Sequence, residues 1–371
     1  MKHISRPLIW VISFLLIATI ACNQSTPGVI PTLQSTVFDS GRTAYGFFPT
    51  PVEVSLEAVF DIYKKIGQHG DVVLMQREIP WKEFVDSAEG QSKAIDDIHN
   101  QYILAHQNNL DVIFIVDPLN GLNRREFYNL PFGWKASFGN PDVRSAMTNF
   151  TLRVVREFKP AYLGLGSEIN TYADTSPHDF NNYVSLYGEI YTLVKAESPD
   201  TKIFVTFQWE ELNNLIPGLR PDRNPYDINW DQMEIFEPHL DAWVISSYPF
   251  IAFPSGADIP EDYYSPLLER TSKPLAVAEG GFPSVGKGTF AGTPQDQVDY
   301  LYAIHDQIGN RLDFWIYLIL RDFNMEAFEK EMRKGGHGRD SETLSWFAKV
   351  GFMELDGTPK PALEIWDGFR K

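Results

Sequence analysis

Two glutamates stand at the ends of runs that otherwise lack charge. Glu168 follows residues 163–167 (LGLGS), and Glu279 follows residues 275–278 (LAVA). Two facing carboxylates are what glycoside hydrolysis requires, because one protonates the departing oxygen while the other attacks the anomeric carbon or activates water. Either glutamate alone fits a helix cap or a salt-bridge partner as well. Together they form a candidate catalytic pair.

Eight short apolar runs can position this pair. They cover residues 44–48, 71–76, 110–117, 161–168, 202–208, 242–248, 275–279 and 313–318. Most are continuously hydrophobic, as strands buried on both faces are, and amphipathic stretches with helical spacing lie in several of the gaps. Alternating strands and helices predict an α/β fold with a parallel sheet.

Eight units, with no early Gly-rich phosphate fingerprint, favour one closed (β/α)₈ TIM barrel over an open doubly wound sheet. The active sites of such barrels lie at the carboxyl ends of the strands. Glu168 and Glu279 end the fourth and seventh runs. These two strands lie on opposite sides of the barrel, so their ends can flank a bond held between them.

The pattern resembles the large clan of retaining glycosidases that carry an acid/base glutamate at strand four and a nucleophile glutamate at strand seven. The resemblance covers about residues 44–370, and the layout is most similar to the family 53 endo-β-1,4-galactanases. Residues 246–249 (SSYP) look like the clan's strand-six tyrosine, and residues 314–315 (FW) look like its sugar-platform tryptophan. The segment 351–363 resembles the closing phrase of many clan enzymes.

The resemblance implies a role for each matching residue. Glu168 acts first as general acid and then as base, and Glu279 is the nucleophile, kept ionised and oriented by Tyr248. Arg77, at the end of the second run, resembles an arginine that supports the nucleophile, although a plain salt bridge fits it equally well. A retaining mechanism expects the two carboxyl groups about 5–5.5 Å apart.

One residue departs from the clan pattern. The clan usually has asparagine immediately before the strand-four glutamate, where it contacts the sugar 2-hydroxyl, and this chain has Ser167. A serine hydroxyl reaches less far, so recognition of that hydroxyl must differ, and Asn170 is a possible substitute. The departure puts the identity of the substrate in doubt and, to a lesser degree, activity itself.

Three tryptophans are candidates for sugar subsites, because sugar rings stack their C–H faces on exposed aromatic rings. Trp134 follows the third run, Trp209 follows the fifth, and Trp315 lies in the eighth. The alternative for each is packing of a loop against the barrel.

The first residues have the layout of an export signal. Lys2 and Arg6 precede the apolar run 8–20, which is short for a membrane-spanning helix. Residues 19–22 (TIAC) resemble a bacterial lipobox, whose cysteine is lipidated; ordinary signal cleavage or an inert buried cysteine is the alternative for Cys22.

This organisation predicts a lipoprotein signal peptide at 1–21, a tether at 22–40 that begins with lipidated Cys22, and a barrel domain at 41–371. The expected location is the bacterial cell envelope, on the periplasmic or cell-surface side. Membrane contact is expected only through the lipid.

The formal net charge of −17 disfavours nucleic acid as a partner, because such a surface repels phosphate backbones. The histidines are scattered without a His-Glu-x-x-His motif, so neither a metal nor another cofactor is expected. The expected partner is a carbohydrate substrate, and the expected state is a monomer.

Two other functions remain open. One is a catalytically inactive, surface-anchored carbohydrate-binding lipoprotein on the same barrel, which Ser167 favours. The other is a barrel hydrolase or lyase that acts on something other than a glycoside.

Overall fold

The computed structural model describes residues 37–216, 220 and 222–371. The strands are β1 (Ala44–Phe48), β2 (Val72–Glu78), β3 (Asp111–Asp117), β4 (Leu119–Asn120), β5 (Asn123–Phe127), β6 (Tyr162–Gly164), β7 (Lys202–Phe204), β8 (Thr206–Gln208), β9 (Trp243–Ser247), β10 (Leu275–Gly280) and β11 (Leu312–Ile319). The α-helices are α1 (Leu56–His69), α2 (Trp81–Phe84), α3 (Lys93–Gln107), α4 (Pro141–Phe158), α5 (Ile169–Thr175), α6 (Pro177–Glu197), α7 (Trp209–Leu212), α8 (Asp231–Glu234), α9 (Pro266–Arg270), α10 (Pro294–Ile308), α11 (Met325–Gly335), α12 (Ser341–Ser345) and α13 (Pro361–Arg370).

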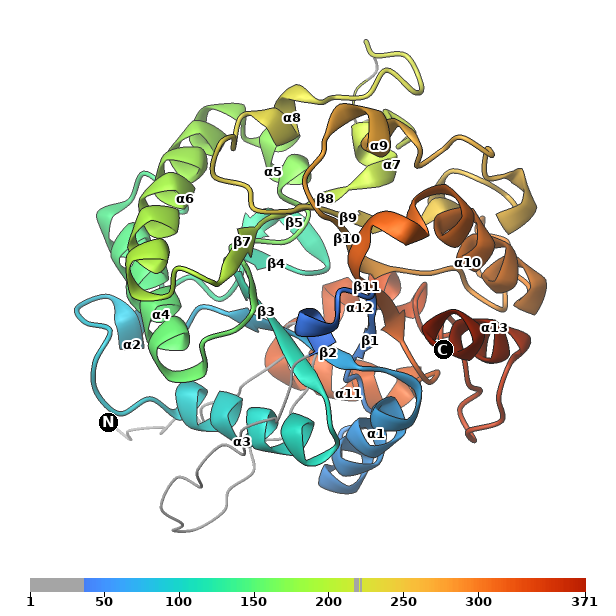
Figure 1. Cartoon of the computed structure of the whole chain (residues 1–371). Coiled ribbons are helices and arrows are strands. Elements are labelled where there is room, and N and C mark those ends of the chain that lie inside the picture. The colour runs from blue at the N-terminus through green and yellow to red at the C-terminus, as the bar shows by residue number, and fades with distance from the viewer. Residues whose placement is uncertain (1–36, 217–219, 221) are drawn as a thin grey trace.

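The main sheet is a parallel barrel with helices around it (Figure 1). Its strand order is β7-β6-β3-β2-β1-β11-β10-β9-β8. Only Val205 separates β7 from β8, and β7 pairs with β6 while β8 pairs with β9. Residues 202–208 therefore act as one barrel strand that joins the two edges of the sheet. Each predicted run overlaps a strand of this sheet, and the predicted TIM-barrel fold is confirmed.

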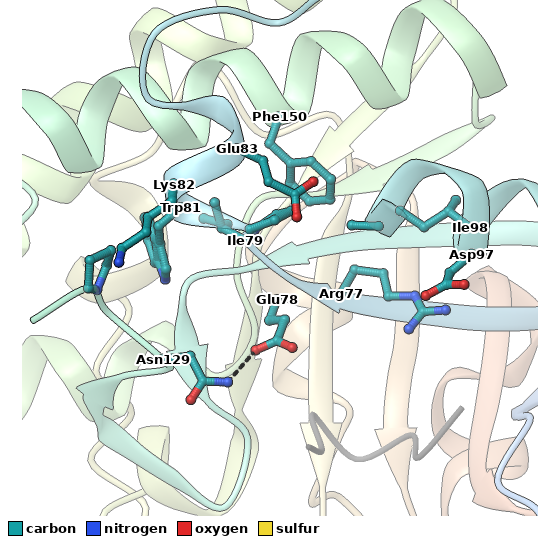
Figure 2. A pocket seen from close by; sticks show the side chains of 13 residues that line it. Arg77, Glu78, Ile79, Trp81, Lys82, Glu83, Asp97, Ile98, Asn129 and Phe150 are labelled. Carbon is teal, nitrogen blue, oxygen red and sulfur yellow. Dashed lines mark hydrogen bonds between the residues drawn. The ribbon is translucent and has the colours of Figure 1, made fainter. Parts of the chain in front are cut away.

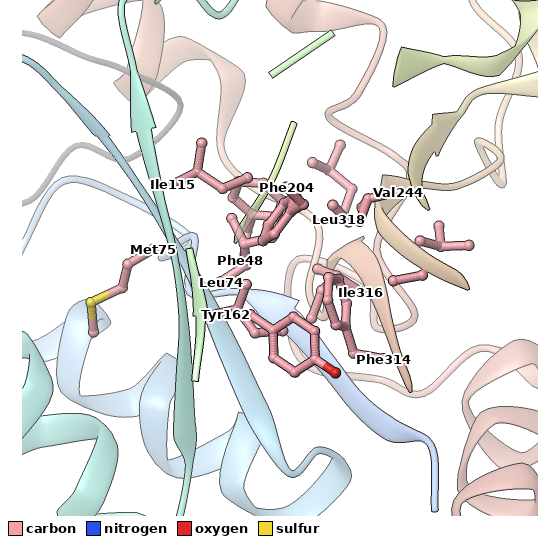
Figure 3. Close-up of a cluster of buried hydrophobic side chains, with 14 of the residues drawn as sticks. Phe48, Leu74, Met75, Ile115, Tyr162, Phe204, Val244, Phe314, Ile316 and Leu318 are labelled. Carbon is pink, nitrogen blue, oxygen red and sulfur yellow. The ribbon is translucent and has the colours of Figure 1, made fainter. Parts of the chain in front are cut away.

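The interior of the barrel is filled by apolar side chains. Leu74, Ile115, Phe204 and Ile316 converge there, whereas Met75 points away from them toward the helices (Figure 3). Successive residues of a strand point to opposite faces, so each strand buries one set inside the barrel and one under the helices. Burial of each such side chain contributes roughly 1.5–3 kcal/mol.

The helices cover the outside of the barrel with one apolar face each. In α1, the side chain of Ser55 caps the amino end by accepting a hydrogen bond from the Ala58 amide at 3.2 Å. Val59 and Ile62 are buried against the barrel, whereas Phe60, on the opposite face, is exposed. This division follows from the helical repeat of 3.6 residues.

Two loop segments meet above the carboxyl ends of the strands, the end that we call the mouth. One is the β4–β5 hairpin that follows β3, and the other is the α11–α12 segment that follows β11. Asn120 on the hairpin donates a hydrogen bond to Asp340 at 3.3 Å, and the rings of Tyr128 and His337 stack at 5.0 Å. These contacts hold the hairpin in place over the mouth.

The packed domain includes residues that the sequence analysis assigned to the tether. Val37 donates its backbone N–H to Asp111 at 2.8 Å, and the ring of Phe38 lies 4.9 Å from that of Tyr162. Val37 and Phe38 therefore belong to the packed domain, and the predicted boundary at residue 41 lies too far along the chain. The predicted signal peptide and Cys22 lie outside the described residues. Within the part of the chain that is described, no helix combines the length and apolarity needed to cross a bilayer.

Candidate active site

Glu168 lies at the mouth, just after β6 and at the amino end of α5. Its backbone is left-handed, with φ of 50°, and its N–H donates to Thr206 Oγ1 at 2.8 Å. This conformation is unfavourable for a residue other than glycine and is found at functional sites more often than elsewhere. The carboxylate does not cap α5. The helix-cap alternative is therefore excluded for its side chain.

The two oxygens of Glu168 have different partners. Oε1 accepts a hydrogen bond from Ser246 Oγ at 2.6 Å, and Oε2 accepts one from Arg124 Nε at 3.1 Å. Glu168 is thus also a salt-bridge partner, as the other alternative held. Nine per cent of its surface remains exposed, so solvent can still reach it.

Glu279 faces the same site because of an irregularity in β10. Ala276 pairs with Val244, whose side chain lies inside the barrel, so regular alternation would turn Ala278 inward and Glu279 outward. The register shifts between Val277 and Glu279, and Glu279 pairs with Ser246 instead. A bulge of this kind re-aims a side chain. It directs Glu279 into the barrel.

Tyr248 donates its hydroxyl proton to Glu279 Oε1 at 2.8 Å. Tyr248 and Ser246 lie two residues apart at the end of β9 and therefore on the same face. One strand end thus contacts both candidate catalytic carboxylates, Glu168 through Ser246 and Glu279 through Tyr248. Glu279 is 8% exposed, comparable to its partner.

Arg124 on β5 is the cation of the site. Its guanidinium forms ion pairs with Asp117 and Glu168, and Asp117 also accepts a hydrogen bond from Gln76 Nε2 at 2.6 Å. Burial disfavours the charge of Arg124, but the fields of Asp117, Glu168 and Glu279 outweigh it and raise the pKa of Arg124. The sequence analysis did not single out Arg124 or Asp117, although an aspartate that ends an apolar run was a usable signal.

The surroundings of Glu279 act on its pKa. Burial and, next, the negative charge of Glu168 raise the pKa of Glu279 to about 8, against the lowering effects of Arg124 and Tyr248. This shift opposes the ionisation that the resemblance implies for Glu279.

Arg77 does not support Glu279. It pairs with Val116 in the β2–β3 ladder, one residue beyond the Gln76–Ile115 pair, and so faces the helices rather than the barrel interior. It lines a cavity of about 450 Å³ beside Asp97 of α3 (Figure 2). Its Nε and Nη2 atoms are buried without hydrogen-bond partners. Strand alternation overturns this part of the resemblance.

Trp315 and Trp209 are buried, with no exposed surface, and cannot meet a sugar where they lie. Trp315 faces the helices, with its ring 5.2 Å from that of Trp366 on α13. The indole N–H of Trp209 donates to the Tyr263 carbonyl at 3.2 Å. Both predicted subsites are wrong, and the packing alternative holds. Trp134 is half-buried in a rim groove of about 580 Å³, so its predicted role stays a prediction.

Ser167 and Asn170 serve the scaffold. Ser167 is buried with its hydroxyl 3.1 Å from Thr206 Oγ1. Asn170 is also buried; its amide donates to the Gln208 carbonyl at 3.1 Å and accepts from the Gln208 N–H at 2.8 Å. The polar atoms of Asn170 are engaged with the backbone, which contradicts its suggested contact with a sugar hydroxyl, and Ser167 is too buried to bind substrate where it lies.

Among the described residues, no three histidine, cysteine, aspartate or glutamate side chains form a group that could hold a metal ion. The mouth presents a carboxyl pair, an arginine and hydroxyl donors. A carboxyl pair that carries one proton can deliver that proton to one atom and attack another.

Several solved structures that share this fold are glycoside hydrolases. The exo-β-1,4-mannosidase Op5Man5 from Opitutaceae bacterium strain TAV5 is 13% identical, with a TM-score of 0.60 over 88% of this chain and 58% of the mannosidase. The family 53 catalytic domain from Ignisphaera aggregans is 13% identical, with a TM-score of 0.52 over 91% of this chain and 98% of that domain. A fungal β-1,4-galactanase is 14% identical, with a TM-score of 0.53 over 89% and 95% of the two chains.

The sequence matches no protein-family model and no curated protein. The structure is similar to glycoside hydrolases of families 5, 39 and 53, and at these identities the similarity establishes the fold. It does not single out family 53, to which the layout was closest. The chemistry has to be argued from the site itself.

Proposed function

We propose that this protein is a glycoside hydrolase that cleaves O-glycosidic bonds of poly- or oligosaccharides by double displacement. The strongest support comes from the end of β9, which contacts both glutamates although they follow two different strands. Ser246 donates a hydrogen bond to Glu168, and Tyr248 donates one to Glu279. Both carboxyl groups also lie in the field of Arg124. A pair of carboxyl groups at a barrel mouth is the arrangement that glycoside cleavage requires.

In the proposed mechanism Glu279 attacks the anomeric carbon while Glu168 protonates the leaving oxygen. Glu168 then takes a proton from a water molecule whose oxygen attacks the anomeric carbon, and this breaks the bond to Glu279 and releases the sugar. The first step needs a proton on Glu168 and a charge on Glu279. Tyr248 favours that distribution because its hydrogen bond lowers the pKa of Glu279.

The ion pair between Arg124 and Glu168 opposes the acid role, because it stabilises the charged form of Glu168. We therefore propose that a bound sugar separates Oε2 of Glu168 from Arg124. The freed guanidinium would remain paired with Asp117 and would lie beside Glu279, where its charge stabilises the nucleophile as an anion.

The test is hydrolysis of a panel of plant and microbial glycans, with NMR of the first anomer formed. Double displacement gives a product of retained configuration. An inverted product would contradict this mechanism, and a complete lack of hydrolysis would contradict glycosidase activity. The neighbours named as β-1,4-mannosidase and β-1,4-galactanase make β-linked mannans and galactans the first substrates to assay.

A second candidate function is carbohydrate binding without catalysis on the same barrel. The Arg124–Glu168 ion pair and the pKa of about 8 for Glu279 favour it, since together they oppose the protonation that cleavage needs. Calorimetric titration with the same glycans separates the two functions. A binding protein gives saturable heat and no product.

We further propose that the protein acts as a monomer attached to the bacterial cell envelope by a lipid on Cys22, a hypothesis that rests on the sequence alone. Replacement of Cys22 by serine should release the protein from the membrane fraction. An unchanged membrane fraction would contradict the anchor.

A further inference from the structure

Glu210 on α7 is a fully buried carboxylate behind the end of β9. Its Oε1 accepts hydrogen bonds from Ser247 Oγ at 2.7 Å and Tyr263 Oη at 3.2 Å. Its Oε2 accepts from Gln208 Nε2 at 2.7 Å and from the Tyr248 backbone N–H at 2.9 Å. Four donors on two oxygens fix both the carboxylate and the groups that bind it.

The bond to the Tyr248 N–H replaces a missing strand partner. Tyr248 lies one residue beyond β9, where the ladder hydrogen bonds end, and a buried N–H needs an acceptor. Glu210 supplies that acceptor. The hydroxyl of the same tyrosine donates to Glu279 at 2.8 Å, so Tyr248 is held by a carboxylate at each end.

The same anchor reaches Glu168 through the strand. Ser247, which is bound to Glu210, follows Ser246, which donates to Glu168 at 2.6 Å. Adjacent residues of a strand point to opposite faces, so a bond on the outer face fixes the rotation of the strand end that carries the inner contacts. Glu210 therefore acts on both inner contacts from outside the barrel.

We propose that Glu210 is a positioning residue that aims Tyr248 at Glu279 and Ser246 at Glu168. The proposal rests on the proposed glycosidase function for its effect on turnover. Its structural part, the aim of Tyr248, stands independently of that function.

Stability alone does not explain this residue. No described lysine or arginine forms an ion pair with Glu210, and burial raises the pKa of Glu210 to about 7 in spite of its hydrogen bonds. A buried carboxylate without a cation opposes folding, whereas an uncharged amide of the same shape would not carry that desolvation penalty. A residue kept at such a disadvantage points to a role in the site.

The donors around Glu210 allow a sharp pair of variants. Gln208 and the Tyr248 N–H can only donate to Oε2, but the two hydroxyls at Oε1 can reverse and accept. In Glu210→Gln, the carbonyl can therefore accept from Gln208 and the Tyr248 N–H, and the NH₂ group can donate to the two hydroxyls. This variant keeps Tyr248 in place. Glu210→Ala removes the acceptor altogether.

We expect Glu210→Ala to lower kcat by about 100-fold, the scale that a misplaced catalytic group produces, with KM within about 3-fold. Glu210→Gln should stay within about 5-fold of the wild type. Asp71→Asn is the matched control, because Asp71 also accepts a strand N–H, that of Tyr45 at 3.1 Å, but at the amino end of the barrel. It should leave kcat within about 2-fold.

A carboxyl ¹³C NMR titration of Glu279 in the full chain, assigned by comparison with Glu279→Gln, separates this proposal from the proposed function. The Tyr248 hydrogen bond lowers the pKa of Glu279, so Glu210→Ala should raise the titration midpoint of Glu279 while Glu210→Gln and Asp71→Asn leave it unchanged. If the wild type hydrolyses no glycan, the proposed function fails. The Glu279 titration midpoints still decide whether Glu210 positions Tyr248.

The proposal is overturned if the titration midpoint of Glu279 in Glu210→Ala equals that of the wild type. It is also overturned if Glu210→Gln loses as much kcat as Glu210→Ala. If circular dichroism shows that Glu210→Ala does not fold, Ser247→Ala is used in its place. Ser247→Ala removes one hydrogen bond to Glu210 and keeps Glu210 itself. We expect Ser247→Ala to shift the Glu279 midpoint in the same direction by a smaller amount. No shift there overturns the proposal.

Discussion

Two arginines near the mouth of the same barrel, the buried Arg124 and the partly buried Arg77, have opposite surroundings. Arg124 faces the barrel interior, where its guanidinium is paired with Asp117 and Glu168. Arg77 faces the helices, and its Nε and Nη2 atoms have no hydrogen-bond partner. Sequence resemblance favoured Arg77 as the functional arginine, and the structure favours Arg124.

This difference shows that the position of a residue along a strand does not determine the face to which its side chain points. The end of β2 is the right place for a residue that supports chemistry, but alternation turns Arg77 to the wrong face. The β5 hairpin, in contrast, folds Arg124 back over the mouth. We expect substitutions on the interior face to change activity and substitutions on the helix face to leave it unchanged.

The largest effect should come from the carboxyl pair itself. Glu279→Gln should lower kcat by about 10⁵-fold, since it removes the nucleophile, and Glu168→Gln by about 10²–10⁴-fold, the usual range for a general acid. Both variants should still bind the glycan in calorimetry. A wild-type rate for Glu279→Gln would show that the carboxyl pair on the interior face does not carry out the reaction.

The next largest effect should come from Arg124. Arg124→Met leaves Asp117 and Glu168 buried without their cation, and we expect kcat/KM to fall by about 10²–10³-fold and the free energy of unfolding by about 3–5 kcal/mol. Steady-state kinetics and urea denaturation measure the two effects. Wild-type kinetics in a destabilised Arg124→Met would show that the ion pair serves only the fold.

The pH dependence sharpens the account of the interior face. The nucleophile must be ionised, and burial together with the charge of Glu168 raises the pKa of Glu279 to about 8. Glu168 must carry a proton at the same time, so kcat/KM should be bell-shaped with pH. Its descending limb should have a midpoint near pH 8, above which kcat/KM falls by about 10-fold per unit. Tyr248→Phe removes a hydrogen bond that lowers this pKa and should move the midpoint upward. A midpoint near the ordinary value of 4.5 would contradict the buried, coupled site.

The smallest effect is expected on the helix face. Arg77→Met removes a buried charge without hydrogen-bond partners at Nε and Nη2, so kcat/KM should stay within about 2-fold of the wild type and the thermal midpoint should not fall. Arg124→Met is the matched comparison, because it makes the same change on the other face. A large loss of activity in Arg77→Met would break the distinction between the faces.

The sequence by itself determined the barrel and the approximate place of its chemistry. Continuous apolar runs are required where strands are buried on both faces, and polar residues at their carboxyl ends are not required by packing, so the ends that carry Glu168 and Glu279 stood out. The segment around Tyr248 was recognisable through its resemblance to the clan's strand-six tyrosine.

Only the tertiary structure decided which way the side chains point. The bulge at Ala278 turns Glu279 inward, alternation turns Arg77 and Trp315 outward, and a hairpin brings Arg124 to the site. A shift of one residue reverses the face of every later side chain in a strand, and the energy of that shift depends on the neighbouring strands. Contacts of this kind are set between segments far apart in the chain, so periodicity within one segment cannot encode them.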